Sequence, residues 1–250
     1  MKFWASLLLL CSVACSFSAA AQPLKTYTNV QCLDMAPNGT LYFFSANNLV
    51  AWQNGKELFR FHTQGKTIAN IDARNGFEIL AFYQLQQSFQ LFDNRLSEIT
   101  PVMLLPNNLW VNNIKQSVNN EFWTISNNTQ RLSKLSKNMM MLSQQNQAYF
   151  EHLQLVKDLN GKLIAHNTNA VMVFSNTGAL LNEITIENIS AVALINQQLY
   201  VCADNTIYAV SLTDNKKTPL TTLPDVPTHF AVFGNTIYYL NGGSIQEQVF

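Results

Sequence analysis

Residues 152–184 read HLQLVKDLNGKLIAHNTNAVMVFSNTGALLNEI, which divides into four short apolar strands joined by three polar turns. The turns fall at Asn160-Gly161, at residues 167–169 and at residues 176–178. Asn and Gly favour tight β-turns, because both tolerate the backbone angles that such turns require. Four short strands joined in this way form a unit of the size of one β-propeller blade.

The first of these turns recurs along the whole chain. Equivalent polar turns stand at Asn38-Gly39, Asn75-Gly76, Asn119-Asn120, Asn196-Gln197 and Gly234-Asn235. The steps between successive first residues are 37, 44, 41, 36 and 38 residues. A period of about 40 residues made of short strands is typical of a propeller with one four-stranded blade per repeat. The sequence therefore predicts an all-β, six-bladed β-propeller that occupies residues 22–250 as a single domain.

Three segments fit the repeat less regularly. Residues 96–103 are expected as the fourth strand of blade two and residues 109–114 as the first strand of blade three. Residues 130–142 are open to two interpretations, a strand or a short excursion. The last blade has only three predicted strands, while the extended segment Leu24 to Thr28 remains at the other end of the chain. We expect this N-terminal segment to close the ring by covering the exposed edge of the last blade.

Residues 1–21 have the pattern of a signal peptide. Lys2 supplies a positive start, residues 3–14 form an apolar run, and residues 19–21 are three alanines that offer a cleavage site. The apolar run is too short to be a stable membrane anchor. We therefore expect an exported mature chain without a transmembrane segment, located in the periplasm or at the cell surface of a Gram-negative bacterium.

A second interpretation of this segment centres on Cys15. Residues 12–15 read SVAC, which partly resembles a bacterial lipoprotein box, in which the cysteine is lipidated and becomes the new N-terminus. After cleavage near Ala21 only Cys32 and Cys202 remain. They fall in predicted blades one and five, which are not neighbours in a ring of six. Two buried thiols are the favoured interpretation, and one disulfide is the alternative.

The composition restricts the partners. Charged residues make up 12% of the chain, the net charge is +0, and Asn and Gln together supply nearly a fifth of the residues. A protein without a stripe of basic residues on its surface binds nucleic acid poorly. The sequence also lacks the spacings typical of metal, phosphate-binding or nucleophilic sites. We expect no cofactor and no metal, and the sequence leaves the oligomeric state open.

Two stretches carry a resemblance to a known family. Residues 33–42 read LDMAPNGTLY and residues 171–178 read VMVFSNTG. Both resemble the repeats of NHL-type and TolB-like six-bladed propellers, in which a turn of Asp or Asn with Gly precedes a short strand. The resemblance covers most of the chain as a pattern. It implies a binding platform, since such propellers mostly bind other molecules and only a minority are enzymes.

Three carboxylates occupy similar places near the ends of predicted first strands, namely Asp34, Asp72 and Asp158. Aligned carboxylates can bind a cation or share a proton. They can equally accept N–H bonds within the turn that follows, and this is the interpretation we favour. Asp34 and Asp72 remain candidate ligand-binding residues.

Among the four histidines, His152 and His229 lie near the starts of first strands, so we expect that they could meet in the central channel. Most aromatic residues fall at alternating strand positions and are expected in the core. Trp110 is the exception, because it follows Pro106-Asn107-Asn108 in a loop that would open on one face. It is a candidate for contact with a ligand.

Two functions follow from these observations. The first is a non-catalytic exported propeller that binds an envelope or secreted protein, or acts as an accessory factor in the bacterial cell envelope. The alternative is a carbohydrate-active or other hydrolytic enzyme that uses the channel carboxylates Asp34 and Asp72. Glycosidase chemistry would need two accessible carboxyl groups roughly 5–10 Å apart.

Overall fold

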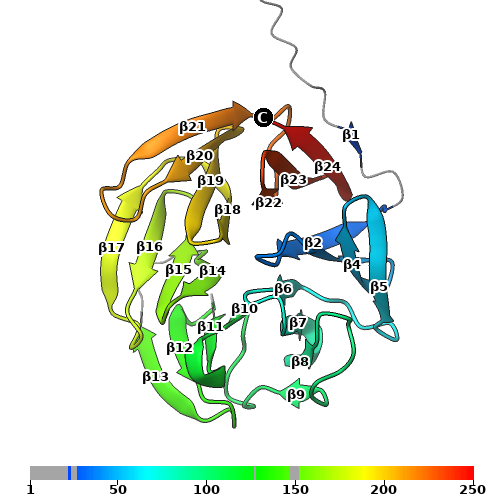
Figure 1. The fold of residues 1–250 in the computed structure, drawn as a ribbon. Coiled ribbons are helices and arrows are strands. Elements are labelled where there is room, and N and C mark those ends of the chain that lie inside the picture. Colours follow the sequence, from blue (N-terminus) through cyan, green and yellow to red (C-terminus); the bar gives the residue numbers. More distant parts are fainter. Residues whose placement is uncertain (1–21, 24–26, 127, 147–151) are drawn as a thin grey trace, which may run out of the picture.

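The computed structural model describes residues 22–23, 27–126, 128–146 and 152–250. The chain forms a ring of six four-stranded antiparallel sheets around a central axis, which confirms the predicted six-bladed β-propeller (Figure 1). In each sheet from blade one to blade five the strands follow in sequence order from the axis to the rim (Figure 1).

Blade one consists of β2 (Val30–Met35), β3 (Leu41–Ser45), β4 (Asn48–Gln53) and β5 (Lys56–His62). Blade two consists of β6 (Asn70–Asp72), β7 (Ile79–Tyr83), β8 (Ser88–Phe92) and β9 (Met103–Leu104). Blade three consists of β10 (Asn113–Gln116), β11 (Phe122–Ser126), β12 (Arg131–Leu135) and β13 (Met141–Asn146). Blade four consists of β14 (Gln154–Leu159), β15 (Lys162–His166), β16 (Ala170–Phe174) and β17 (Leu180–Thr185). Blade five consists of β18 (Ile189–Ile195), β19 (Gln198–Ala203), β20 (Thr206–Val210) and β21 (Lys217–Thr222). Blade six consists of β22 (His229–Phe233), β23 (Thr236–Asn241) and β24 (Ser244–Val249), joined by β1 (Gln22–Pro23).

The tight turns have the backbone angles that their residues favour. Asn54 and Gly55 link β4 to β5 with φ of 50° and 80°, and Asn160 and Gly161 link β14 to β15 with φ of 52° and 85°. Two positive φ angles in a two-residue loop match the right-handed twist of the strands, which explains the frequency of Asn and Gly at these places.

The core consists of apolar layers between the blades. The buried side chains described by the structure form one cluster at each contact between neighbouring blades. In the cluster between blades three and four, for example, Trp123 packs with Leu163 and Phe174. The alternation of large apolar residues along the strands therefore serves packing between sheets, as predicted for most aromatic residues.

The structure corrects the boundaries of three predicted strands. The outer strand of blade two is only Met103–Leu104, because Leu96 lies in a turn with φ of 62° and Pro101 has no N–H to donate. The inner strand of blade three begins at Asn113 instead of residue 109. Residues 130–142 form β12, a turn, and the start of β13, so this segment is not an excursion.

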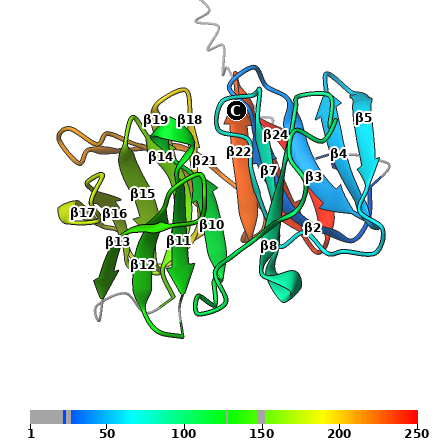
Figure 2. The ribbon, with the colours of Figure 1, turned by 90° about the horizontal axis from the view of Figure 1, so that it is seen from below.

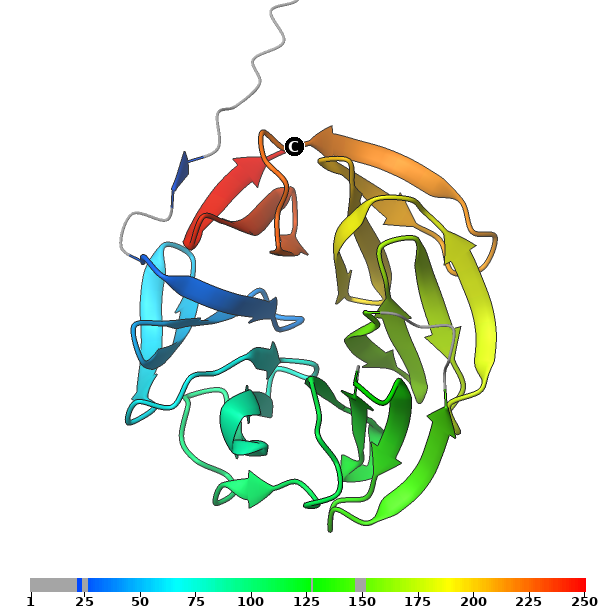
Figure 3. The same cartoon turned by 180° about the vertical axis from the view of Figure 1, so that it is seen from behind.

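An N-terminal segment lies beside the last blade, but earlier in the chain than predicted. Gln22 and Pro23 pair antiparallel with Glu247 and Gln246 of β24 (Figure 3). Of the predicted segment 24–28, residues 24–26 lie outside the described residues, and Tyr27 and Thr28 are not in a strand. The ring of Tyr27 instead packs edge-on against Phe43, with centroids 4.6 Å apart.

The predicted signal peptide and Cys15 also lie outside the described residues. Cys32 and Cys202 are both buried free thiols, in agreement with the favoured interpretation. The described helices are two single turns, η1 (Gln84–Gln86) and η2 (Val118–Asn120), on opposite faces of the ring (Figure 2). In the part of the chain that the structure covers, no helix is long and apolar enough to cross a membrane.

Candidate functional site

The inner strands of all six blades surround a polar cavity on the axis. Their side chains alternate between the neighbouring blades and the axis, as in any strand. The polar residues that line the cavity are Asp34, Asn70, Asn113, Lys115, Gln154, Lys157, His166, Thr228 and His229. The structure thus brings two of the predicted candidates, Asp34 and His229, into one cavity.

An ion pair spans this cavity between opposite blades. The Lys157 ammonium of blade four lies 2.9 Å from Oδ1 of Asp34 in blade one. It also donates a hydrogen bond of 3.0 Å to the carbonyl oxygen of Met35. Both side chains are mostly buried, so solvent screens this pair little. The contact ties together two strands that are more than 100 residues apart in the sequence.

The second oxygen of Asp34 binds the next blade. Its Oδ2 accepts a hydrogen bond of 2.8 Å from the backbone N–H of Ala73. Burial by itself would raise the pKa of Asp34, but the ammonium groups of Lys157 and Lys115 and the Ala73 N–H together lower it. Asp34 is therefore a carboxylate at neutral pH, with both oxygens engaged.

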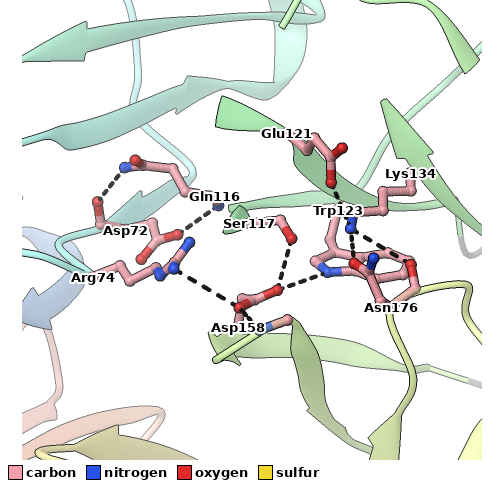
Figure 4. A network of polar contacts seen from close by, with 10 residues as sticks. Asp72, Arg74, Gln116, Ser117, Glu121, Trp123, Lys134, Asp158 and Asn176 are labelled. Carbon is pink, nitrogen blue, oxygen red and sulfur yellow. Dashed lines mark hydrogen bonds and ion pairs between the residues drawn. The ribbon is translucent and has the colours of Figure 1, made fainter. Parts of the chain in front are cut away.

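Asp72 repeats this contact one blade further on. Its Oδ2 accepts a hydrogen bond of 2.7 Å from the backbone N–H of Gln116 in blade three (Figure 4). The side chain is fully buried, and its Oδ1 has no hydrogen-bond partner among the described residues. Burial raises the pKa of Asp72, against the attraction of Lys115, and the charge of Asp34 adds to the rise. The two candidate carboxyl groups thus have pKa values shifted in opposite directions.

Asp158 joins three blades. Its Oδ2 accepts hydrogen bonds from the Ser117 hydroxyl, at 2.7 Å, and from Nε1 of Trp123, at 3.2 Å (Figure 4). Its Oδ1 accepts from the N–H of Gly161, at 2.8 Å, and lies 3.9 Å from Nη2 of Arg74 in blade two. Beside this group, Lys134 lies over the Trp123 ring and 2.6 Å from Oε2 of Glu121.

These contacts correct the predicted role of the carboxylates. Only Asp158 binds the turn that follows it, through Gly161. Asp34 and Asp72 accept N–H bonds from the next blade, because the inner strands converge there and expose their last N–H groups to one another. Neither supplies the accessible pair needed for hydrolysis, since Asp72 is fully buried and does not line the cavity.

The histidine in the cavity beside His229 is His166, so the predicted meeting of His152 and His229 is wrong. His152 is exposed in the turn before β14. Burial lowers the pKa of His166 to about 4, and burial together with the charge of Lys115 lowers that of His229 to about 4. Both imidazoles are therefore neutral at neutral pH. Among the described residues, no three His, Cys, Asp or Glu side chains come together as a metal site.

Trp110 lies outside the cavity and, as expected, in an open loop. Its side chain is 51% exposed, and two other exposed apolar residues, Leu85 at 77% and Leu104 at 69%, lie on chain segments that Gln87 joins to this loop. Gln87 holds the three segments together. Its carbonyl accepts from the N–H of Leu105, and its side-chain amide makes two hydrogen bonds with the backbone of Val111. We call Leu85, Leu104 and Trp110 the apolar patch.

Lys115, Lys157 and His166 were not among the predicted site residues. A signal for the lysines was present, because charged residues are scarce in this chain and both lysines lie on inner strands. Placing Lys115 on the axis also required the correct start of β10. His166 lies on a second strand, where the repeat pattern alone does not indicate that a side chain reaches the cavity.

The sequence matches no protein-family model and no curated protein. Solved structures do match over most of the chain. A streptogramin B lyase is 14% identical with a TM-score of 0.62, and the match covers 92% of this chain and 86% of that one. A gluconolactonase-like protein is 10% identical with a TM-score of 0.66, covering 92% and 91%. A chain of the mitotic checkpoint complex is 9% identical with a TM-score of 0.59, covering 89% and 75%. At these identities the similarity shows the fold alone, and the fold is a six-bladed β-propeller.

Proposed function

We propose that this protein is an exported, non-catalytic β-propeller that binds another protein in the bacterial cell envelope, as a partner or accessory factor. The observation that carries the proposal is the contrast between its polar centre and its apolar patch. Asp34, Asp72 and Asp158 are engaged in contacts that hold the blades together. Trp110 and its neighbours, in contrast, are exposed on a rigid support.

The apolar patch has the composition of a protein-binding surface. Tryptophan is enriched at the centres of protein interfaces, and exposed apolar groups rimmed by polar residues mark interaction sites. Gln87 fixes the loop that carries Trp110 through bonds of 2.7 and 3.0 Å to Val111. A preorganised aromatic side chain loses little conformational entropy when it binds. We expect a partner that covers the patch with apolar side chains.

The similar structures include enzymes as well as a member of a protein complex, so they do not choose between the two functions. The hydrolytic alternative would require Asp34 or Asp72 to leave its partner. Removing one partner from a buried ion pair costs about 3–5 kcal/mol. We therefore prefer the binding function.

The test is a crosslinking experiment in intact Gram-negative cells, with the full-length chain carrying a tag after Phe250. A specific envelope protein should be captured by the wild-type protein and lost with Trp110→Ser and Leu85→Ser together. The matched control is Phe77→Ser, which removes a side chain that is 74% exposed in the loop between β6 and β7. Capture that is equal in all three proteins, or absent in all, would contradict the proposal. Mass spectrometry of the same protein tests export, since cleavage after Ala21 leaves Gln22 as the first residue.

A further inference from the structure

The central cavity carries an excess of positive charge. Its lining residues include two ammonium groups, Lys115 and Lys157, but a single carboxylate, Asp34. Lys157 is neutralised by Asp34 at 2.9 Å. Both histidines of the lining are neutral above pH about 4. Lys115 is therefore the ammonium of the lining that has no carboxylate in direct contact, although Asp34 and the buried Asp72 attract it from further away.

Lys115 has hydrogen-bond partners but no ion-pair partner. The residue is 5% exposed, and its Nζ donates 2.7 Å to the carbonyl oxygen of Ile71. With the Asn70 amide turned so that its nitrogen donates to Ile114, its oxygen lies 3.2 Å from the same Nζ. Within the described residues, no carboxylate oxygen lies within 4.0 Å of it. An ammonium has three N–H bonds, so one remains after these two oxygens.

The surroundings of Lys115 suit an anion. Asn113, Gln154 and His229 line the same cavity and carry side-chain N–H groups. The Asn113 side-chain oxygen is buried without a hydrogen-bond partner among the described residues, so turning this amide to direct its NH₂ into the cavity would break no hydrogen bond of that oxygen. A buried ammonium without a carboxylate in direct contact is costly, which favours taking up an opposite charge.

We propose that the central cavity binds a small monovalent anion, a halide or a short carboxylate such as acetate, against Lys115 with Asn113 and His229 as further donors. The anion adds a negative charge beside Lys115 and links blades three and six. This site is separate from the apolar patch and does not depend on the proposed partner.

The first test is direct. Crystals of the mature protein are soaked in bromide, and the anomalous signal of bromine is measured. The proposal predicts a peak within hydrogen-bond distance of Nζ of Lys115. Peaks confined to the outer surface would overturn it.

The second test measures thermal unfolding at constant ionic strength, with a bulky sulfonate replaced stepwise by bromide or by acetate. A bound anion stabilises the folded state in a saturable way. We expect Tm to rise with at least one of the two anions, and the stronger response identifies a halide or a carboxylate site. An equal, unsaturable response to all anions would contradict the proposal.

Variants locate the effect. Lys115→Gln should raise the half-saturating anion concentration at least about tenfold, since a charge-assisted hydrogen bond is lost. Lys162→Gln removes the same charge from the exposed end of β15 and should leave the response unchanged. If Lys115→Gln fails to fold, Asn113→Ala takes its place, with a weaker response expected. A wild-type response in both Lys115→Gln and Asn113→Ala would overturn the proposal.

Discussion

The inner strands of blades one to four carry a polar residue at the place where those of blades five and six carry an apolar one. Asp34, Asp72, Lys115 and Asp158 hold this position in the first four blades, each paired with the second residue of the following strand. Leu194 and Val232 hold it in the last two, where each stands one residue before the end of its inner strand. The first four blades therefore add hydrogen bonds and ion pairs to their apolar packing, whereas the last two blades have apolar side chains alone at this position.

The difference shows when a propeller tolerates charge at its centre. Each carboxylate at this position in the first four blades accepts hydrogen bonds from another blade, as Asp72 does from the N–H of Gln116. Val232 of blade six instead packs with Phe230 and Tyr239 between blades five and six. The same position in the repeat is thus polar or apolar according to what its neighbour presents.

The largest loss of stability is expected when a carboxylate is introduced at this position in blade six. Val232→Asp places a charge in a site that is 2% exposed and lined by apolar side chains. We expect the free energy of unfolding to fall by more than about 4 kcal/mol in urea titrations. Val232→Ala is the control and should lose about 1–3 kcal/mol. An aspartate that costs no more than the alanine would show that donors are within reach there.

The next largest loss of stability is expected when the ammonium group of Lys157 is removed. Lys157→Met leaves Asp34 without its partner at 2.9 Å, and the free energy of unfolding should fall by about 3–5 kcal/mol. Lys162→Met, on the exposed end of β15, should change it by less than about 0.5 kcal/mol. Similar losses in both variants would mean that the cross-ring contact contributes little.

Lowering the pH should reduce the stability of the fold through the two cavity histidines, His166 of blade four and His229 of blade six. Their pKa is lowered to about 4 in the fold, so the unfolded chain binds protons first as pH falls below about 6.5. Stability is therefore fully present above pH about 6.5 and declines toward pH 4, by up to about 3 kcal/mol per histidine. Urea titrations across this range should show a shallower decline for His166→Gln. His62→Gln, in the exposed outer strand β5, is the matched control variant.

The smallest effect is expected for Asp72→Asn. Burial raises the pKa of Asp72, so the fold disfavours its charged form relative to the unfolded chain, and an amide retains the acceptor for the N–H of Gln116. The cost at pH 7 should be below about 1 kcal/mol. Because the folded pKa is raised, wild-type stability gains from this group as pH falls toward about 4, and the variant should lack that gain. A loss at pH 7 as large as that of Asp34→Asn would reverse this assignment.

The sequence predicts the ring well because every blade repeats one pattern of turns and apolar alternation. Errors occur where a single residue interrupts the pattern, as at Pro101, or where a side chain replaces a strand partner, as Gln87 does for Val111. The site was predictable in part. The sequence placed Asp34 and His229 near the axis, where both line the cavity, but the pairing of Lys157 with Asp34 joins opposite blades, and no local pattern encodes such a contact.

The central claim is that the charges on the axis hold the blades together. A double-mutant cycle between Asp34→Asn and Lys157→Met, read out as the free energy of unfolding in urea, tests it most directly. The account predicts a coupling energy of at least about 2 kcal/mol, since the pair is buried and joined at 2.9 Å. A coupling below about 0.5 kcal/mol, the range of independent sites, would contradict it.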